Sequence, residues 1–306
     1  MDFAEALEHH AMILAEAAII ECLKRAGTVT LHPELENALL VRDPAGREAL
    51  AALYETYVRI ARQAQLPILL ATPTWRAGRD RLAEAGVEGD LNRDAADFMK
   101  GLRRTAGPFA RNIYLAGLLG TRNDAYKPEE GLSLHAARTV HAWQADRLAS
   151  AGVDVLQAVT LPAVDEATGM ALAMEATGLP FLVSFVIGRH GRLLDGTPLG
   201  EAIGRIDGLC DRPPLGYMIN CAYPSFLHPA TEPPGVLERL VGFQANGSSL
   251  DHGDLDGAGA LEADPVDDWG DRMLALHRDA GFTILGGCCG TGPEHLAYLA
   301  RGRPGA

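Results

Sequence analysis

The chain alternates eight short apolar runs with longer stretches of helical periodicity, and this alternation limits its possible folds more than any other feature. Continuous apolar runs are typical of parallel strands, which are buried on both faces of their sheet. The predicted strands span residues 11–20, 66–72, 112–119, 153–161, 180–187, 216–221, 240–245 and 282–285. The predicted helices between them include residues 46–64, 134–151, 164–177 and 267–280.

Eight strand–helix units favour an α/β fold of the (β/α)8 TIM-barrel type, as a single domain over residues 1–306. The rival is a doubly wound sheet, but no G-x-G-x-x-G phosphate loop follows the first run. That run, 11–20, is rich in alanine, so helix propensity competes with strand formation there. Segments 122–131 and 248–265 are long enough to be loops over the barrel mouth.

Charge and composition exclude several classes of partner. The chain has 27 Lys and Arg against 40 Asp and Glu, for a net charge of −13, which argues against nucleic acid or anionic membrane as partner. It contains no apolar stretch that spans a bilayer and no signal-peptide pattern, so we expect a cytoplasmic protein. In that compartment the five cysteines are expected to be reduced, and clustered cysteines bind metal more often than they form disulfides.

Three of the cysteines follow predicted strands. Cys221 ends the sixth strand, and Cys288 and Cys289 follow the eighth. The carboxyl ends of barrel strands meet at one mouth, so we expect the three sulfurs to converge there. Three protein ligands with one open tetrahedral position are the arrangement of a catalytic zinc site. A thiol that enters the open position loses its proton and becomes a nucleophile at neutral pH.

Other interpretations of the cysteines stay open. A closed zinc site would need a fourth ligand, and the nearest histidines in sequence are His228 and His295, the latter expected on a helix surface. A disulfide between the two adjacent cysteines is a further alternative, although it would be strained. Residues 291–294 predict a capping box that opens a helix whose N-terminus faces the site. Cys22 and Cys210 are expected to be ordinary small apolar residues.

Several motifs together resemble a known family. Gly-Gly-Cys-Cys-Gly at 286–290, Asn-Cys at 220–221, Ser-Phe at 184–185 and Asp-Gly-Thr-Pro-Leu at 195–199 are similar to those of the homocysteine S-methyltransferases. Asn246 resembles the asparagine of the family's Tyr-Pro-Asn segment. The resemblance covers nearly the whole chain. It implies a (β/α)8 barrel, zinc on the three cysteines, and methyl transfer to the zinc-bound thiolate of homocysteine, as in methionine biosynthesis.

The chain also departs from the family pattern. The family's first strand usually ends in Asp-Gly-Gly, whereas the equivalent here begins at Glu16 and has no glycines. The family's Glu-Thr in strand four is Val159-Thr160 here. In the family the two acids hold the ammonium of homocysteine, and a buried ammonium without a carboxylate is costly. Two interpretations stay open. In one, the acceptor thiol lacks an α-amino group, or carries a bulkier apolar group beside Val159. In the other, Glu16 or Glu21 alone binds the ammonium, and homocysteine is the acceptor.

The remaining site predictions concern the substrates, a small-molecule thiol acceptor and a methyl donor. By resemblance the donor is a small sulfonium, such as S-methylmethionine, or a small ammonium, such as a betaine. Such cations are commonly held against aromatic faces. Trp75 follows the second strand and Tyr223 follows the sixth, so we expect both at the mouth. The predicted substrate-binding residues are Glu16, Trp75, Val159, Thr160, Asn220, Tyr223 and Asn246.

Together these patterns predict a zinc-dependent S-methyltransferase, with no catalytic residue beyond the zinc ligands. One alternative is an onium demethylase that passes the methyl group to another thiol or to a corrinoid carrier protein. Another is a non-catalytic barrel that binds zinc or thiols. The chain keeps all three cysteines while the neighbouring motifs change, and this favours altered specificity over loss of function.

Overall fold

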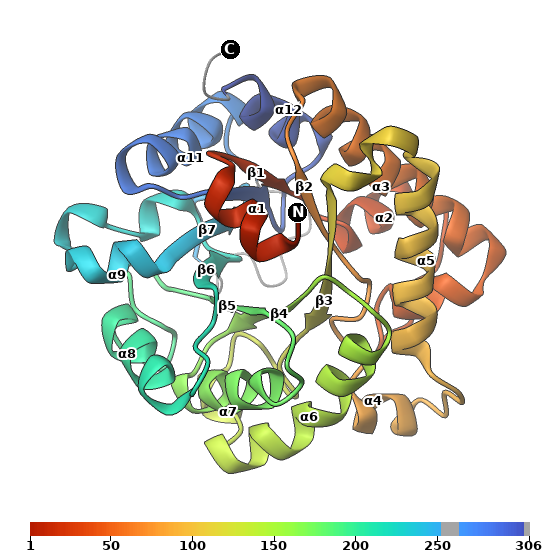
Figure 1. Ribbon diagram of the computed structural model, residues 1–306, viewed down its shortest axis with the longest axis horizontal. Helices are drawn as coiled ribbons and strands as arrows, with labels where there is room; N and C mark the ends of the chain where they lie inside the picture. The colour runs from red at the N-terminus through yellow and green to blue at the C-terminus, as the bar shows by residue number, and fades with distance from the viewer. Residues whose placement is uncertain (252–262, 303–306) are drawn as a thin grey trace.

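Eight parallel strands pair in chain order and close into a barrel, with β1 beside β8, in the computed structural model of the protein (Figure 1). The structure describes residues 1–251 and 263–302. The (β/α)8 prediction is confirmed. The strands are β1 (Ile13–Ala15), β2 (Ile68–Ala71), β3 (Ile113–Leu119), β4 (Val155–Leu161), β5 (Phe181–Phe185), β6 (Gly216–Asn220), β7 (Leu240–Ala245) and β8 (Ile284–Gly287).

Helices surround the barrel on its outside (Figure 1). The α-helices are α1 (Phe3–His9), α2 (Ile20–Ala26), α3 (Pro44–Ala64), α4 (Arg79–Glu84), α5 (Leu91–Thr105), α6 (Leu134–Ser150), α7 (Val164–Glu175), α8 (Leu199–Leu209), α9 (Pro234–Arg239), α11 (Val266–Ala280) and α12 (Pro293–Arg301). The 3-10 helices are η1 (Ala38–Arg42), η2 (Gly107–Asn112), η3 (Pro128–Glu130), η4 (Pro224–Phe226) and η5 (Pro229–Thr231). In the part of the chain that is described, no helix combines the length and hydropathy needed to cross a bilayer.

The first predicted strand is the one that differs most from the structure. The run 11–20 forms a strand only over Ile13–Ala15, and helix α2 already begins at Ile20. The alanine-rich sequence is weakly suited to a strand, so its pairing with β2 and β8 covers few residues. This early end leaves Glu16 and the residues after it as a loop at the barrel mouth.

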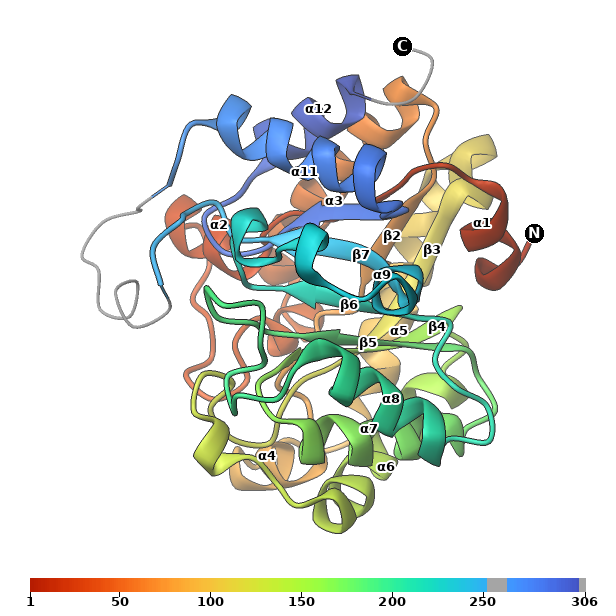
Figure 2. The same cartoon turned by 90° about the vertical axis from the view of Figure 1, so that its left-hand side faces the viewer.

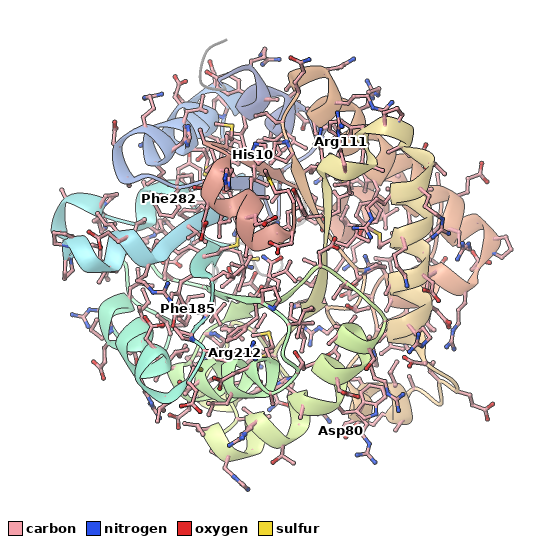
Figure 3. All side chains as sticks on the ribbon, viewed as in Figure 1. His10, Asp80, Arg111, Phe185, Arg212 and Phe282 are labelled. Atoms are coloured by element: carbon pink, nitrogen blue, oxygen red, sulfur yellow. The ribbon has the colours of Figure 1, made fainter. Side chains whose placement is uncertain are left out.

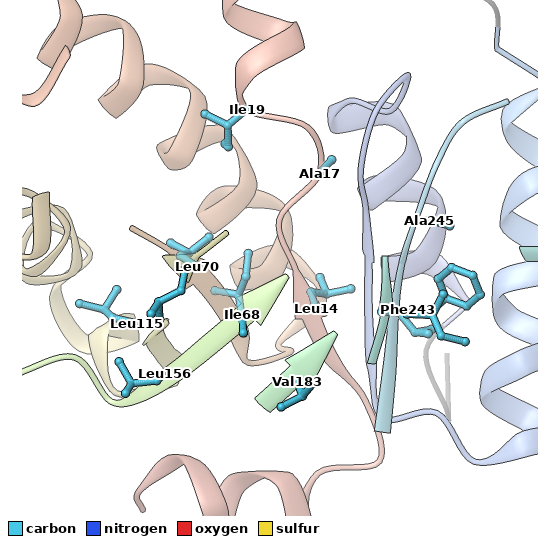
Figure 4. Packing of buried hydrophobic residues seen from close by; sticks show 14 of the residues in the cluster. Leu14, Ala17, Ile19, Ile68, Leu70, Leu115, Leu156, Val183, Phe243 and Ala245 are labelled. Carbon is cyan, nitrogen blue, oxygen red and sulfur yellow. The ribbon is translucent and has the colours of Figure 1, made fainter. Parts of the chain in front are cut away.

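Side chains alternate between the inside and the outside of the barrel, as the pleat of each strand requires. One buried cluster packs between strands and helices and includes Leu14, Ile68, Leu156 and Val183 (Figure 4). Phe185 of this cluster lies inside the ring of helices, whereas charged side chains such as those of Asp80 and Arg111 lie toward the periphery (Figure 3). A second cluster contains the residues of opposite register and fills the barrel: Ile13, Ala15, Leu69, Ala71, Tyr114, Ala116, Val155, Leu182, Met218 and Ile284.

The two ends of the barrel differ. Helix α1, which the sequence did not predict, covers the amino end of the strands, where Phe3 and Ala6 join the inner cluster. Figure 2 shows α1 at one end of the barrel and α2 at the other. Along the strands, inward positions change from apolar to polar, as in the step from Val155 to Gln157. The amino end is therefore a packed core, and the carboxyl end is free to form a site.

Candidate metal centre and substrate pocket

Three cysteines converge at the carboxyl end of the barrel. Cys221 directly follows β6, and Cys288 and Cys289 directly follow β8. The three sulfur atoms lie within 4.8 Å of one another, and no other His, Cys, Asp or Glu within residues 1–251 and 263–302 joins the group. Two cysteines adjacent in sequence and a third from the end of β6, one strand away from β8 across β7, thus form one cluster.

The spacing of the sulfurs suits a tetrahedral ion. Zinc–sulfur bonds of about 2.3 Å place the sulfurs of a tetrahedral site about 3.8 Å apart. The three cysteines fit this geometry with little movement, and soft thiolates are ligands that zinc prefers. The cluster also lines a pocket, so an ion held by the three sulfurs would border that pocket.

Backbone hydrogen bonds fix the two cysteine-bearing loops against β7 and its following turn. The Cys221 N–H donates to the Gln244 carbonyl at 3.1 Å, and the Cys288 N–H donates to the Ala245 carbonyl at 2.7 Å. The Gly247 N–H donates to the Cys289 carbonyl at 2.7 Å. Each cysteine is therefore hydrogen-bonded through its backbone either to β7 or to the turn that follows β7.

The side chain of Asn220 holds Cys221 from the other side. Its amide nitrogen donates to the Cys221 sulfur at 3.2 Å and to the Thr160 hydroxyl at 2.7 Å. Its oxygen accepts from the Thr160 N–H at 2.9 Å and from the Ser184 hydroxyl at 2.7 Å. Thr160 and Cys221 have φ angles of 58° and 51°, which non-glycine residues adopt rarely. Strained residues of this kind cluster at functional sites, where the surroundings enforce them.

The sulfurs influence each other's ionisation. Hydrogen bonds from the Cys288 and Cys289 thiols hold the pKa of Cys221 well below its usual range. The same contacts raise the pKa of Cys288 and of Cys289 well above theirs. A cation bound among the three sulfurs would stabilise the thiolate form of each of them.

Tyr126 is a site residue that sequence reasoning missed. Its hydroxyl hydrogen-bonds the Cys221 sulfur, and burial at this position raises the pKa of the phenol well above its usual range. Tyr126 lies in the predicted loop 122–131, whose ends are fixed by Glu166: its carboxylate accepts from the Arg122 N–H at 3.0 Å and from the Leu132 N–H at 3.1 Å. The only sequence signal was an aromatic residue in a long loop after a strand.

The pocket over the cysteines has a volume of about 360 Å³. Most of its surface is apolar, and its acidic side chains are those of Glu16, Glu21 and Glu36. Lys24 is the only basic residue among the described residues that line it. The pocket therefore favours a cation or a neutral group over a lone anion in its interior.

Glu16 and Val159 line the same pocket as the three cysteines. Glu16 is 7% exposed, and its carboxylate accepts a hydrogen bond from the Ala71 N–H at 2.8 Å. Burial raises the pKa of Glu16 to about 8. Val159 is also 7% exposed and offers no polar atom. These two positions thus give the pocket one carboxyl group and one apolar side chain.

The other predicted substrate residues fall into two groups. Trp75, Thr160 and Asn220 line the pocket. The guanidinium of Arg76 already lies over the Trp75 ring, 4.2 Å from its centroid. Contrary to our expectation, Tyr223 and Asn246 do not line the pocket. They are 4% and 3% exposed.

Tyr223 and Asn246 pack behind the residues that line the pocket. Tyr223 begins the tight turn into η4, so its ring packs into the outer core cluster, where its hydroxyl hydrogen-bonds Asp264. The Asn246 amide donates to the Cys221 carbonyl at 3.1 Å. A residue that directly follows a barrel strand can thus place its side chain in the surrounding core rather than in the pocket.

Three expectations about the cysteine surroundings are wrong. Helix α12 begins at Pro293, so Thr291 does not cap it; the Thr291 hydroxyl donates to the Cys288 carbonyl at 2.6 Å instead. His295 is 3% exposed rather than on the helix surface, and its Nδ1 accepts from the Gly292 N–H at 3.1 Å. Cys22 is half-buried and receives a hydrogen bond from Arg25 at 3.1 Å, so it is not a purely apolar residue. Cys210 is buried as expected.

The loop predicted at 248–265 lies largely outside the described residues, since 252–262 are not among them. Its described ends are tied together. The Asp264 N–H donates to the Gly247 carbonyl at 2.8 Å, and the Ser249 N–H donates to the Asp264 carboxylate at 3.0 Å.

Comparisons with known proteins agree with the resemblance in the motifs. The family model for homocysteine S-methyltransferase matches residues 7–302. The homocysteine S-methyltransferase of Escherichia coli (strain K12) is 27% identical over 319 residues, covering 96% of each chain. Homocysteine S-methyltransferase 4 of Zea mays is 28% identical over 173 residues, covering 54% of this chain and 48% of the relative.

Solved structures of the E. coli homocysteine methyltransferase MmuM share the fold. Its oxidized form has a TM-score of 0.75 at 21% identity and covers 96% of this chain and 97% of its own. Its metallated form has a TM-score of 0.74 at 21% identity and covers 97% of this chain and 98% of its own.

Proposed function

The chain belongs to the homocysteine S-methyltransferase family, and on this premise we propose that it is a zinc-dependent thiol S-methyltransferase. The reaction moves a methyl group from a small sulfonium or ammonium donor to the sulfur of homocysteine or a related thiol. The observation that carries the proposal is the group of three cysteine sulfurs, within 4.8 Å of one another, at the base of a pocket.

Cys221, Cys288 and Cys289 would hold the zinc ion, and bound zinc supplies the charge that keeps an acceptor thiol ionised at neutral pH. The residues around them keep the three sulfurs in place. Asn220 orients the Cys221 sulfur through its amide, and Thr291 ties the Cys288 carbonyl. Such partners of metal ligands commonly account for about 10–100-fold in metal affinity or activity.

The methyl donor is a cation, and the pocket supports that choice by its charges. Glu21 and Glu36 line it together with the cysteines, and a cation near these carboxylates is favoured electrostatically. Aromatic rings add to this, since Trp75 also lines the pocket, although Arg76 lies over its ring. Transfer of the methyl group removes the positive charge of a sulfonium donor and the negative charge of the acceptor thiolate, so the attraction between the two reacting centres ends with the reaction.

The acceptor is held on the side of Glu16 and Val159. Homocysteine carries an ammonium that needs a carboxylate partner inside the pocket, and Glu16 offers one. Because burial raises the pKa of Glu16 to about 8, binding of an ammonium there requires the carboxyl to release its proton. Val159 offers only apolar contact, which suits a thiol without the amino group equally well or better.

The test is a methyl-transfer assay on zinc-loaded protein, with S-methylmethionine and a betaine as donors, homocysteine as acceptor, and mass spectrometry of the products. We expect methylated thiol from the wild type and from Cys210→Ser, which changes a buried cysteine far from the cluster. We expect Cys288→Ser to lose both its zinc and its turnover. Turnover in Cys288→Ser equal to that of the wild type, or zinc and thiol binding without any methylated product, would contradict the proposal.

A further inference from the structure

Glu166 is a buried carboxylate that belongs to α7 and does not line the pocket. The residue is 1% exposed. One carboxylate oxygen is 3.0 Å from both the Arg122 N–H and His141 Nε2, and the other accepts from the Leu132 N–H at 3.1 Å. Burial opposes ionisation, but these hydrogen bonds together hold the pKa of Glu166 below its usual range. An ionised carboxylate has no proton to donate, so His141 is the donor in their pair.

A charge buried this deeply is costly unless it is paired and hydrogen-bonded. Glu166 meets this condition by joining three segments: the chain at 122, the chain at 132, and α6 through His141. Helices α6 and α7 are closely packed here, because Gly169 of α7 leaves no room for a Cβ beside the Leu134 carbonyl of α6. The carboxylate therefore attaches both ends of the loop 122–131 to a tightly packed helix pair.

The loop 122–131 connects β3 to α6 and is closed by hydrogen bonds of its own. The Asn123 amide donates to the Glu130 carbonyl at 2.7 Å, and the Tyr126 N–H donates to the Asp124 carboxylate at 2.9 Å. Compact loops of this length whose ends lie close together are Ω-loops, and they frequently carry function. Tyr126 lies near the middle of the loop, so the two attached ends determine where it can reach.

Tyr126 connects this loop to the cysteines. Its hydroxyl hydrogen-bonds the Cys221 sulfur, and its side chain lines the pocket. The residue is nevertheless 39% exposed, so core packing covers only part of it. A large side chain that is partly exposed depends for its position on the backbone that carries it. That backbone is the loop attached to Glu166.

A sulfonium donor in the pocket meets the Cys221 sulfur as well as the acceptor sulfur. Methyl transfer to Cys221 would form a carbon–sulfur bond on the protein and break the bond between the methyl carbon and the donor, whose electron pair would stay on the leaving sulfide. A thiolate that accepts hydrogen bonds is a weaker nucleophile, because its lone pairs are engaged. Asn220 donates one such bond to Cys221 at 3.2 Å, and Tyr126 donates a second.

We propose that Glu166 is a positioning residue that protects Cys221 from alkylation. It acts through the loop 122–131, which holds the Tyr126 hydroxyl on the Cys221 sulfur. The inference deepens the proposed function and rests on it, since Cys221 is a proposed zinc ligand beside a methyl donor. Glutamine cannot replace Glu166, because it keeps one acceptor oxygen and turns an NH2 group toward a backbone N–H at one end of the loop.

The test measures how fast iodoacetamide alkylates Cys221 in the full-length protein after zinc is removed, with peptide mass spectrometry to assign each cysteine. Cys210 is the internal reference, because it is buried outside the cluster and reports general opening of the fold. A hydrogen bond to a charged group contributes about tenfold, so Tyr126→Ala should raise the Cys221-to-Cys210 rate ratio by about that factor. Glu166→Gln should raise the ratio nearly as much. Glu166→Asp, which is one methylene shorter, should raise it in the same direction.

The double variant shows whether Glu166 acts through Tyr126. We expect Glu166→Gln to add nothing in the Tyr126→Ala background, whereas independent effects would multiply. Asp154→Asn is the matched control and should keep the wild-type ratio. Its carboxylate also accepts from a backbone N–H, that of Leu115 at 2.7 Å, but it precedes β4 at the amino end of the barrel.

Three results would overturn the proposal: a wild-type ratio in both Glu166 variants, multiplied effects in the double variant, or an equal rise in Asp154→Asn. General loosening of the fold raises both rates together, so it leaves the ratio unchanged and counts against the proposal as well. The assay contains neither zinc nor a methyl donor. Failure of the proposed methyl transfer would therefore appear in the turnover assay and not in these rates.

Discussion

The two sides of the pocket are built differently. On the side of β6 to β8, every cysteine is tied by backbone or side-chain hydrogen bonds, and Asn220 and Thr291 complete the frame. After β1 and within β4, the pocket has the carboxyl group of Glu16 and the apolar side chain of Val159. We propose that the cysteine side fixes the reaction, whereas Glu16 and Val159 select the acceptor and can change without loss of the chemistry.

Removal of one cysteine should have the largest effect and would test the cysteine side alone. In Cys221→Ala we expect zinc content and methyl transfer to fall to background, because two sulfurs cannot complete a zinc site of three protein ligands. Cys22→Ala is the matched control, since Cys22 lies beside Thr291 but outside the cluster. Zinc content by mass spectrometry and turnover are measured together. A Cys22→Ala protein as depleted in zinc as Cys221→Ala would argue against the assigned ligands.

The frame around the cysteines should have the next largest effect. Asn220→Ala removes four hydrogen bonds that orient Thr160, Ser184 and Cys221, and we expect about a 10–100-fold loss in zinc affinity. Ser184→Ala removes only one of them and should lose less. Competition with a chromogenic chelator measures both affinities. Equal affinities in Asn220→Ala and the wild type would show that the cysteines need no such support.

Val159→Glu tests the opposite side of the pocket. A carboxylate at this position gives an acceptor ammonium a second partner, so we expect turnover of homocysteine to rise about tenfold relative to 4-mercaptobutyrate. Val159→Gln is the control of equal size without the charge. Both thiols compete in one mixture, and mass spectrometry measures the product ratio. If Val159→Glu and Val159→Gln give the ratio of the wild type, this side does not select the acceptor in the way we describe.

The last prediction concerns the buried carboxyl itself and is an effect on stability rather than on turnover. The pKa of Glu16 is raised by burial to about 8, from 4.5 in the unfolded chain. Between these values the folded protein binds more protons than the unfolded chain, so its stability falls as pH rises, by up to about 1.4 kcal/mol per pH unit. Glu16→Gln stays neutral and should lack this slope. Urea unfolding from pH 5 to 8 measures the free energy of unfolding of the zinc-loaded wild type and of Glu16→Gln. Equal slopes of that free energy against pH in the two proteins would contradict the raised pKa.

The features that were predicted correctly depend on patterns that the sequence displays directly. Apolar runs of strand length, separated by helical stretches, define the barrel, and the strand ends then place the cysteines at one mouth. The short first strand was overestimated because the run 11–20 is apolar throughout, and apolar character alone does not say where pairing with β2 and β8 stops.

The features that were missed depend on contacts between distant segments. Tyr126 reaches Cys221 only because Glu166 fixes the ends of its loop, and no spacing in the sequence connects these residues. The sequence predicted His295 on the surface of α12, but α11 covers it. The Trp269 ring of α11 lies edge-on to the His295 ring, with 5.0 Å between the ring centroids.

The most direct test of the metal centre is X-ray absorption at the zinc edge, with and without the acceptor thiol. We predict three sulfur ligands at about 2.3 Å in the zinc-loaded protein, and four after homocysteine or 4-mercaptobutyrate is added. The fourth sulfur would show that the position facing the pocket accepts the substrate. A sulfur count that is unchanged by every thiol that the protein methylates would contradict an open zinc site formed by Cys221, Cys288 and Cys289.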